Sequence, residues 1–266
     1  MVTTEPAHRT LLVRPPSPAL ADGELTHLER VPVDAALAAA QWARYVDVFR
    51  DLGWAVRELP AADEHPDGVF VEDAVVVFDA PGSDARGLAV LTRPGALSRR
   101  GEIESMRPVA AATGREVAEI AEPGTLEGGD ILKVGRTVYV GRTLRTNAEG
   151  AAQLRALLEP RGWSVVEVPV TKALHLKTAV TALPDGTVIG YPPLVDDPSV
   201  FPSFLPVPEA EGTAVVVLDQ DTVLLSEGAP GTAALLRERG LTVRTTPVSE
   251  FEKLEGCVTC LSVRVR

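Results

Sequence analysis

Apolar residues recur along the chain with two different spacings, one typical of helices and one typical of strands. Trp42, Tyr45, Val46 and Phe49 fall at positions i, i+3, i+4 and i+7, which predicts an amphipathic helix that Gly53 ends. Short β-branched runs with turn residues on either side predict strands between such helices. The alternation of the two patterns favours an α/β fold.

A helix-ending glycine followed by a strand recurs at four places along the chain. These segments are residues 53–59, 114–120, 162–168 and 240–246. Pairs of strands are predicted beside them, at residues 69–78, 131–140, 178–190 and 215–225. Ser98, Asn147 and Thr232 are predicted as helix N-caps, because their side chains can accept a backbone N–H. An N-terminal strand at 11–13 and a C-terminal strand that contains both cysteines share a fifth unit.

Five such units in one chain of 266 residues predict a five-bladed ring of small sheets with helices outside, and we treat residues 1–266 as a single domain. A doubly wound sheet would also alternate strands with helices, but it should contain fewer hairpins. Residues 191–211 are rich in proline and show little periodicity. We assign this segment to the fourth unit.

The excess of acidic over basic residues limits the kinds of molecule that the protein is expected to bind. The chain has 37 acidic and 26 basic residues, for a formal net charge of −11. This excess argues against nucleic acid or an anionic membrane as the main partner, and it favours a cationic small-molecule ligand. No apolar run is long enough to cross a bilayer, and the first residues lack the pattern of a secretory signal. We therefore expect a cytoplasmic protein whose thiols are reduced.

The two cysteines, Cys257 and Cys260, raise the question of a catalytic thiol. Such a thiol needs a histidine or a positive field that lowers its pKa from about 8.5. Among the four histidines, His175 is the one that begins an apolar segment, which we predict as a strand. A hydrogen-bonded structural histidine is the alternative interpretation.

Two pairs of acidic residues stand out. Glu127 and Asp130 flank two glycines, which permit a close approach of backbone segments, although a simple turn has the same composition. Glu72 and Asp73 interrupt an apolar run, where an unpaired carboxylate would be costly to bury, so we expect a cation beside them. The cysteine pair matches only half a zinc site, and no nucleotide-binding motif is present. We expect neither a metal nor a cofactor.

Six stretches of the chain, in order, resemble the dimethylarginine dimethylaminohydrolases of the guanidine-modifying, or pentein, superfamily. They are residues 67–73, 92–100, 124–130, 144–147, 174–177 and 260–262. The resemblance spans nearly the whole chain and implies a five-bladed α/β propeller, in which pseudo-fivefold ββαβ-type units surround a central channel. It also implies that Cys260 is the nucleophile, His175 the general acid and base, and Glu127 the carboxylate that orients the histidine.

The same resemblance implies a set of residues that bind the substrate. They are Glu72 and Asp73 for the guanidinium, Arg99 and Arg145 for the carboxylate, and Asp67 with the backbone carbonyl of Leu20 for the α-amine. Carboxylates suit a flat cation, and an arginine offers a planar fork of donors to a carboxylate. At Arg99 an exposed helix start is the alternative interpretation.

The implied reaction is hydrolysis of asymmetric dimethylarginine or monomethylarginine to citrulline and an amine, through a covalent S-alkylthiouronium on the cysteine. Lys177 stands where the related arginine deiminases have an aspartate, which favours methylated substrates. Two alternatives stay open: hydrolysis of unmodified arginine or of another guanidine such as agmatine, and a non-catalytic binding protein on the same propeller.

Two further questions stay open from the sequence. Cys257 could form a disulfide with Cys260 or could be a small buried side chain. Residues three apart on a strand face opposite sides of the sheet, so a disulfide would require a local turn. The oligomeric state is open between a monomer and a homodimer.

Overall fold

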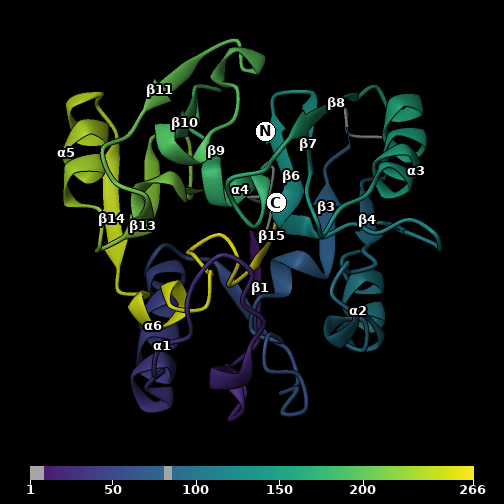
Figure 1. Ribbon diagram of the computed structural model, residues 1–266, viewed down its shortest axis with the longest axis horizontal. Helices are drawn as coiled ribbons and strands as arrows, with labels where there is room; N and C mark the ends of the chain where they lie inside the picture. Colours follow the sequence, from purple (N-terminus) through teal and green to yellow (C-terminus); the bar gives the residue numbers. More distant parts are fainter. Residues whose placement is uncertain (1–8, 81–85) are drawn as a thin grey trace, which may run out of the picture.

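The computed structural model describes residues 9–80 and 86–266, and in this part of the chain the strands form five three-stranded sheets around a common centre (Figure 1). The sheets have the orders β15-β1-β2, β3-β4-β5, β6-β7-β8, β9-β10-β11 and β12-β13-β14. The strands are β1 (Thr10–Val13), β2 (Ala55–Glu58), β3 (Val75–Phe78), β4 (Leu88–Leu91), β5 (Glu116–Glu119), β6 (Ile131–Val134), β7 (Thr137–Arg142), β8 (Ser164–Pro169), β9 (Val180–Ala182), β10 (Val188–Gly190), β11 (Phe204–Pro206), β12 (Val216–Val217), β13 (Thr222–Ser226), β14 (Thr242–Thr246) and β15 (Val263–Val265). This arrangement confirms the predicted five-bladed ring.

Every sheet joins one antiparallel and one parallel pair, and in four of them a helix connects the two parallel strands. The helices are α1 (Ala35–Asp51), α2 (Glu102–Ala111), α3 (Ala148–Leu158), α4 (Leu176–Ala179), α5 (Pro230–Glu238) and α6 (Ser249–Glu252). Figure 1 shows α1, α2, α3 and α5 at the periphery, as the sequence predicts. Each of these four sheets thereby buries one face under its own helix.

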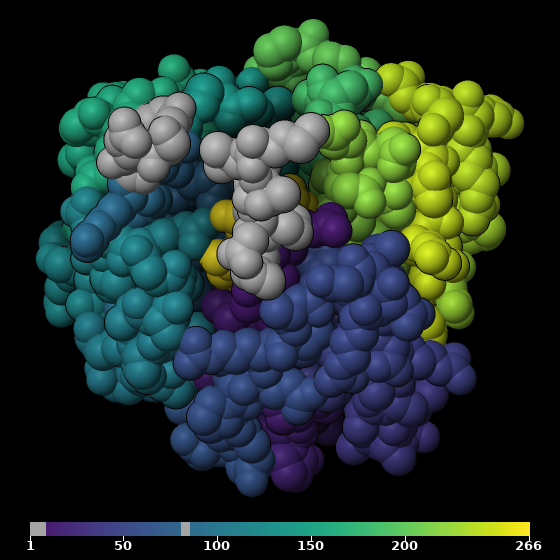
Figure 2. All heavy atoms as spheres, turned by 180° about the vertical axis from the view of Figure 1, so that it is seen from behind, coloured from purple at the N-terminus to yellow at the C-terminus, as the bar shows by residue number. Residues whose placement is uncertain are grey.

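The two ends of the chain meet in one sheet. β1 pairs in parallel with β2 and antiparallel with β15, so the predicted sharing of the fifth unit is confirmed. Figure 2 shows purple N-terminal and yellow C-terminal atoms side by side near the centre of the molecule. The last strand thus closes the ring and carries the segment before it to the middle of the fold.

The fourth blade lacks a connecting α-helix between its parallel strands. β10 and β11 are joined by residues 191–203, which contain the short 3-10 helices η6 (Pro192–Leu194) and η7 (Pro198–Val200). Prolines in the interior of an α-helix remove a hydrogen bond and clash with the preceding turn, so this segment folds as separate turns. The assignment of residues 191–211 to the fourth unit is confirmed.

The glycine pattern found in the sequence has a direct conformational cause. The glycines that precede β2, β5, β8 and β14 all have positive φ angles, and they are Gly53, Gly114, Gly162 and Gly240. A left-handed residue of this kind ends a helix and turns the chain back toward the sheet. In α1, Tyr45, Val46 and Phe49 are fully buried, and burial of each such side chain contributes about 1.5–3 kcal/mol.

Three predicted strands are shorter than expected, and each difference lies beside the centre of the ring. Residues 71–73 form the 3-10 helix η2 (Val71–Asp73), so only Val75–Phe78 of the predicted run is a strand. His175 does not begin a strand; it precedes the one-turn helix α4. The cysteines lie in a turn before β15 and not in the strand itself. Hydrogen bonds to distant side chains hold these turns, as described below.

The three predicted helix caps had different outcomes. Asn147 caps α3 by accepting the backbone N–H of Gly150. Ser98 is not a cap, because α2 begins only after Gly101. Thr232 lies inside α5, where its hydroxyl donates to Glu209 at 2.7 Å. None of the helices in the described residues combines the length and apolarity needed to cross a membrane.

Candidate active site

Segments from several blades meet beside the centre of the ring. They are η2, the 3-10 helix η4 (Gly128–Asp130), the residue before α4 and the turn at 257–260. A Cβ atom on Gly128 would lie 1.9 Å from the carbonyl oxygen of Glu72, and one on Gly129 would lie 2.5 Å from Nδ1 of His175. The two glycines therefore permit the close approach that the sequence predicted.

His175 and Glu127 form a buried hydrogen-bonded pair. Nε2 of His175 lies 2.7 Å from Oε2 of Glu127, while Oε1 of Glu127 accepts the backbone N–H of Gly95 at 3.0 Å. Burial alone would lower the pKa of His175, but the charges of Asp73 and Asp130 and the contact with Glu127 raise it to about 9. The histidine is therefore an imidazolium at neutral pH, oriented by a fixed carboxylate.

Asp130 holds the backbone that presents this histidine. Its Oδ1 accepts the N–H of Leu176 at 2.9 Å, and its Oδ2 accepts the hydroxyl of Thr143 at 2.8 Å. Burial raises the pKa of Asp130 to about 6, against the charge of His175 and these hydrogen bonds, which lower it. The acid on the far side of the two glycines therefore positions the start of α4.

Cys260 is buried, and a turn places it against Cys257. The N–H of Cys260 donates to the carbonyl of Cys257 at 3.1 Å, and the two Sγ atoms lie 3.2 Å apart. The contact between the sulfur atoms lowers the pKa of Cys257 to about 7 and raises that of Cys260, which burial and the charges of Glu72 and Asp73 raise further. The turn that a disulfide would require is present, and both cysteines are free thiols.

Most of the predicted site residues line one small pocket. They are Asp67, Asp73, Arg99, Arg145, His175 and Cys260. Glu127 lies directly behind His175 and is fully buried. The pocket therefore combines a thiol, an imidazolium, carboxylates and guanidinium groups, which together can bind a zwitterion that carries an additional cation.

Asp73 and Arg99 face each other in the pocket wall. Nη1 of Arg99 lies 2.7 Å from Oδ2 of Asp73, and Glu102 accepts two further hydrogen bonds from Arg99 at 2.9 Å each. Burial would raise the pKa of Asp73, but His175 and Arg99 lower it to about 2. Arg99 is 4% exposed, which excludes an exposed helix start. Glu102 was not predicted, although an acid three residues after an arginine at a helix start is a signal for such a pair.

Arg145 is less engaged than Arg99. It donates to the hydroxyl of Thr26 at 3.1 Å, and its Nη1 lies 3.6 Å from Glu127. Asp67 lines the pocket, and the carbonyl of Leu20 lies near it, since a Cβ on Gly23 would approach Oδ1 of Asp67 to 2.7 Å and the Leu20 oxygen to 3.3 Å. Leu20 itself is not among the described residues that line the pocket. The Leu20 side chain itself is fully buried.

Glu255 fixes the loop beside this pocket and was not predicted. Its carboxylate accepts the backbone N–H groups of Thr26, His27 and Leu28 at 2.8, 2.5 and 3.1 Å. Glu255 and Glu24 both line the pocket, so the loop after Leu20 is tied to the segment before the cysteines. No motif distinguishes these acids in the sequence.

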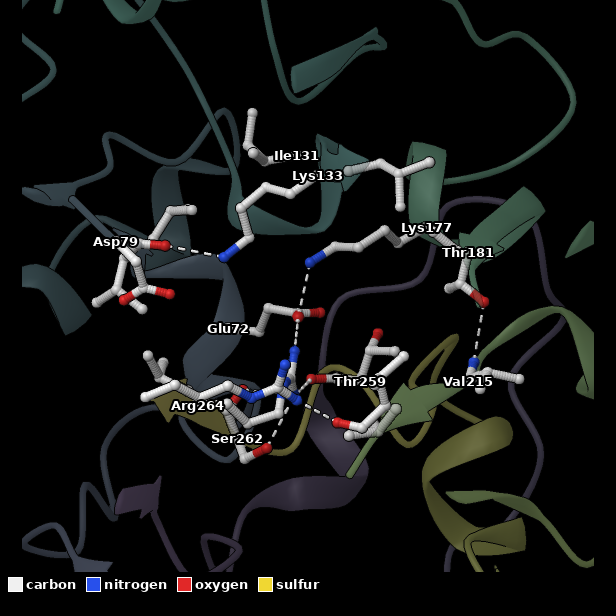
Figure 3. A pocket seen from close by; sticks show the side chains of 18 of the residues that line it. Glu72, Asp79, Ile131, Lys133, Lys177, Thr181, Val215, Thr259, Ser262 and Arg264 are labelled. Carbon is white, nitrogen blue, oxygen red and sulfur yellow. Dashed lines mark hydrogen bonds and ion pairs between the residues drawn. The ribbon is translucent and has the colours of Figure 1, made fainter. Parts of the chain in front are cut away.

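Glu72 is not brought into the pocket. Its Oε1 lies 2.6 Å from Nζ of Lys177 and 2.7 Å from Nη2 of Arg264. Figure 3 shows these side chains pointing into a different cavity, at the centre of the ring. The expected cation beside Glu72 exists, but it comes from the protein's own side chains.

One cluster in the pocket has the composition of a metal site. Asp73, Glu127 and His175 each offer an atom, and these atoms lie within 4.8 Å of one another. Arg99, His175 and the backbone N–H of Gly129 already contact these carboxylates, with the Gly129 nitrogen 2.8 Å from Asp73. The arrangement suits a cation that brings its own donors, such as a guanidinium.

Comparison with known proteins identifies close relatives. No family model matches the chain. An N(G),N(G)-dimethylarginine dimethylaminohydrolase from Streptomyces coelicolor is 56% identical over 255 residues, which cover 96% of each chain. The enzyme of that name from Pseudomonas aeruginosa is 35% identical over 258 residues, which cover 96% of this chain and 98% of the relative.

Solved structures agree with this relationship. A dimethylarginine dimethylaminohydrolase from Pseudomonas aeruginosa, a cysteine-to-serine mutant complexed with citrulline, has a TM-score of 0.85 at 34% identity and covers 96% of this chain and 98% of its own. The N-terminal domain of the cyanobacterial arginine dihydrolase ArgZ has a TM-score of 0.83 at 23% identity, over 97% and 98% of the two chains. The second likeness shows the fold alone.

Proposed function

The chain belongs to the dimethylarginine dimethylaminohydrolase family, and we propose that it hydrolyses Nω-methylated arginines to citrulline and dimethylamine or methylamine. The observation that carries this proposal is that Cys260, His175 and Asp73 line one pocket. A non-catalytic binding protein would have no need to keep a nucleophile, a proton donor and a carboxylate together. We also propose a cytoplasmic location, where both thiols stay reduced.

In this proposal the substrate activates the nucleophile. The resting Cys260 is a thiol, because the neighbouring sulfur, burial and two carboxylates raise its pKa. A guanidinium bound beside Asp73 places a positive charge close to the sulfur. This charge stabilises the thiolate and so lowers the pKa of Cys260, which loses its proton to solvent. The carboxylate also holds the flat guanidinium in place, so that its central carbon faces the sulfur.

The chemical steps follow from the groups in the pocket. The thiolate attacks the guanidinium carbon, and the imidazolium of His175 donates its proton to the departing amine, which leaves an S-alkylthiouronium on Cys260. The neutral imidazole then accepts a proton from water, which attacks the same carbon. Cleavage of the C–S bond regenerates the cysteine and releases citrulline. Glu127 keeps the histidine oriented through both steps.

The remaining pocket residues have roles in recognition. We assign the substrate carboxylate to Arg145 and Arg99, and the α-amine to Asp67 and the Leu20 carbonyl. Arg145 has the less satisfied donors, while Arg99 also positions Asp73. Lys177 contributes no carboxylate to the pocket, because its ammonium pairs with Glu72 in the other cavity. Fewer acids around the guanidinium leave room for its methyl groups.

The test is a citrulline assay with asymmetric dimethylarginine, monomethylarginine, arginine and agmatine. We expect turnover of the methylated arginines, and we expect Cys260→Ser to lower it by at least about 1000-fold while the protein stays folded. Faster turnover of free arginine would identify a deiminase, and no turnover of any guanidine would favour a binding protein.

A further inference from the structure

A second cavity occupies the centre of the ring, separate from the catalytic pocket. Its volume is about 320 Å³, and its walls include β3, β6, β9, β12 and β15, the strand from each sheet that pairs antiparallel with the middle strand. η2 and the cysteine turn separate it from the pocket, since Glu72 and Thr259 line this cavity while Asp73 and Cys260 line the other. A space of this size is at the small end of ligand sites.

The walls of this cavity carry an excess of positive charge. Four cations line it, and they are Lys133, Lys177, Arg264 and Arg266. The two carboxylates that line it are Glu72 and Asp79, and Asp79 also pairs with Arg115 at 2.5 Å. The chain as a whole has a net charge of −11, so this cationic centre is opposite in sign to the rest of the molecule.

Lys133 and Lys177 are the two cations best placed to share a ligand. Figure 3 shows both side chains in the cavity, Lys177 from α4 with its ammonium bonded to Glu72 and Lys133 from β6 with its ammonium turned away from Lys177. Lys133 donates to the backbone carbonyl of Val77 at 2.8 Å. Within residues 9–80 and 86–266, no carboxylate lies within ion-pair distance of its Nζ. Lys177 and Arg264 share a single oxygen of Glu72.

The electrostatic environment of Lys133 favours the binding of an anion, because positive charges surround its ammonium group. Desolvation by the cavity walls, followed by the charges of Lys177 and Arg264, lowers the pKa of Lys133 to about 8, although the side chain is still exposed within the cavity. The two ammonium groups repel each other, and an anion bound beside both would convert this repulsion into attraction.

We propose that the central cavity is a binding site for a small oxyanion with two negative charges, of the class of sulfate and inorganic phosphate. Lys133 and Lys177 would both bind it, and Arg264 would complete the positive field. The site is independent of the proposed reaction, because its lining residues are not those of the catalytic pocket.

Sulfate is the probe for this site, because its charge stays constant across the pH range of interest. Calorimetric titration of the full chain at pH 7 and constant ionic strength should give saturable binding. Lys133→Met should weaken the affinity by at least about 10-fold. Lys172→Met removes the same charge outside the cavity, where the lysine donates to the carbonyl of Val195, and should leave the affinity unchanged. The absence of saturable binding, or equal binding by both variants, would overturn the proposal.

The pH dependence gives a second arm. Sulfate affinity for the wild-type chain should decrease as the pH is raised from 7 to 9, because Lys133 loses its proton over this range. The Lys133→Met variant should lack this decrease. A wild-type affinity that stays constant with pH would contradict the assignment of Lys133.

A third arm needs no variant and therefore does not depend on the folding of one. Amine acetylation of the wild-type chain, followed by peptide mass analysis, should show Lys133 protected by sulfate and Lys172 modified at the same rate with and without it. If sulfate leaves the acetylation of Lys133 unchanged, the site does not exist.

Discussion

Glu72 and Asp73 are neighbours in the chain and equally buried, at 5% and 3% exposure, yet they belong to two different cavities. Asp73 faces the catalytic pocket, where it contacts Arg99 and the backbone of Gly129. Glu72 faces the central cavity, where it contacts two cations. A single turn of 3-10 helix therefore divides two acids between two electrostatic environments.

The cysteine turn divides its side chains in the same way. Cys260 lines the catalytic pocket, while Thr259 and Ser262 line the central cavity, where Arg264 donates to both of their carbonyl oxygens at 3.1 Å. The N–H of Glu72 donates to the carbonyl of Cys260 at 3.3 Å and joins the two segments. Cys260, the proposed nucleophile, thus lies between two cavities: the pocket that contains His175 on one side and the cavity lined by lysines and arginines on the other.

The largest expected effect is oxidation of Cys257 and Cys260, which lie in the turn between the two cavities. A turn with an N–H to carbonyl bond between residues 257 and 260 keeps their Cα atoms within about 7 Å, a range that disulfides span. We expect mild peroxide to oxidise the Cys257 thiolate to a sulfenic acid with release of hydroxide, which takes up a proton to become water. Attack by the Cys260 thiol then forms the disulfide and releases a second water. Intact mass should fall by two hydrogens.

Activity should disappear with this mass change and return on reduction with dithiothreitol. Cys257→Ala is the matched control, since it keeps the nucleophile but removes its partner. Its peroxide products should contain oxygen and should not show the loss of two hydrogens. If the wild-type mass does not fall, the two sulfurs do not form a switch.

The two acids of η2 give the next largest contrast. Asp73→Asn should lower kcat/KM for dimethylarginine by at least about 100-fold, because the guanidinium loses the carboxylate that fixes it. Glu72→Gln should change kcat/KM by less than about 5-fold. It should instead lower the free energy of unfolding by about 3 kcal/mol, because Lys177 and Arg264 are left without their shared anion.

Steady-state kinetics and urea unfolding of the two variants measure this contrast directly. If Glu72→Gln loses as much activity as Asp73→Asn, then Glu72 contacts the substrate, as the family resemblance implied. The central cavity would then be part of the catalytic site, and the separation of the two faces would be incorrect.

The contrast also shows how far the sequence could predict this molecule. The repeated glycine and strand pattern predicted the five blades, because helix caps and strand periodicity depend on neighbouring residues. The direction of Glu72 could not be predicted, because it depends on Lys177 and Arg264, which are distant in the chain. The short turn at His175 likewise depends on Asp130, which binds the N–H of Leu176.

The candidate site likewise contains residues that the sequence could predict and residues that it could not. Motifs in the sequence single out Cys260, His175 and Asp73 as candidate site residues, and these three side chains line one pocket. The contacts of Glu102 with Arg99 and of Glu255 with the loop at 26–28 have no motif. They are supporting interactions, and only the folded chain brings them together.

The smallest expected effect concerns the positive charge of the catalytic pocket. Among the cations that line the pocket in the described residues, His175 is the one that titrates closest to neutral pH. Its pKa is about 9 in the folded chain and about 6.5 in the unfolded chain, so the folded state binds the extra proton between these values. The stabilisation is therefore fully present below about pH 6.5 and is lost as the pH rises through 9. Linkage sets its size at up to about 3 kcal/mol.

Urea unfolding of the wild-type chain and of His175→Asn between pH 6 and 10 measures this stabilisation. The difference between the two proteins is the informative quantity, because Lys133 and the cysteines titrate in both and their contributions largely cancel. The difference should decrease across the window as the wild-type imidazolium loses its proton. A difference that stays constant would mean that His175 is neutral in the folded protein. Arg99, which pairs with Asp73, and Arg145, which lies near Glu127, would then be the cations that line the pocket in the part of the chain that the structure describes.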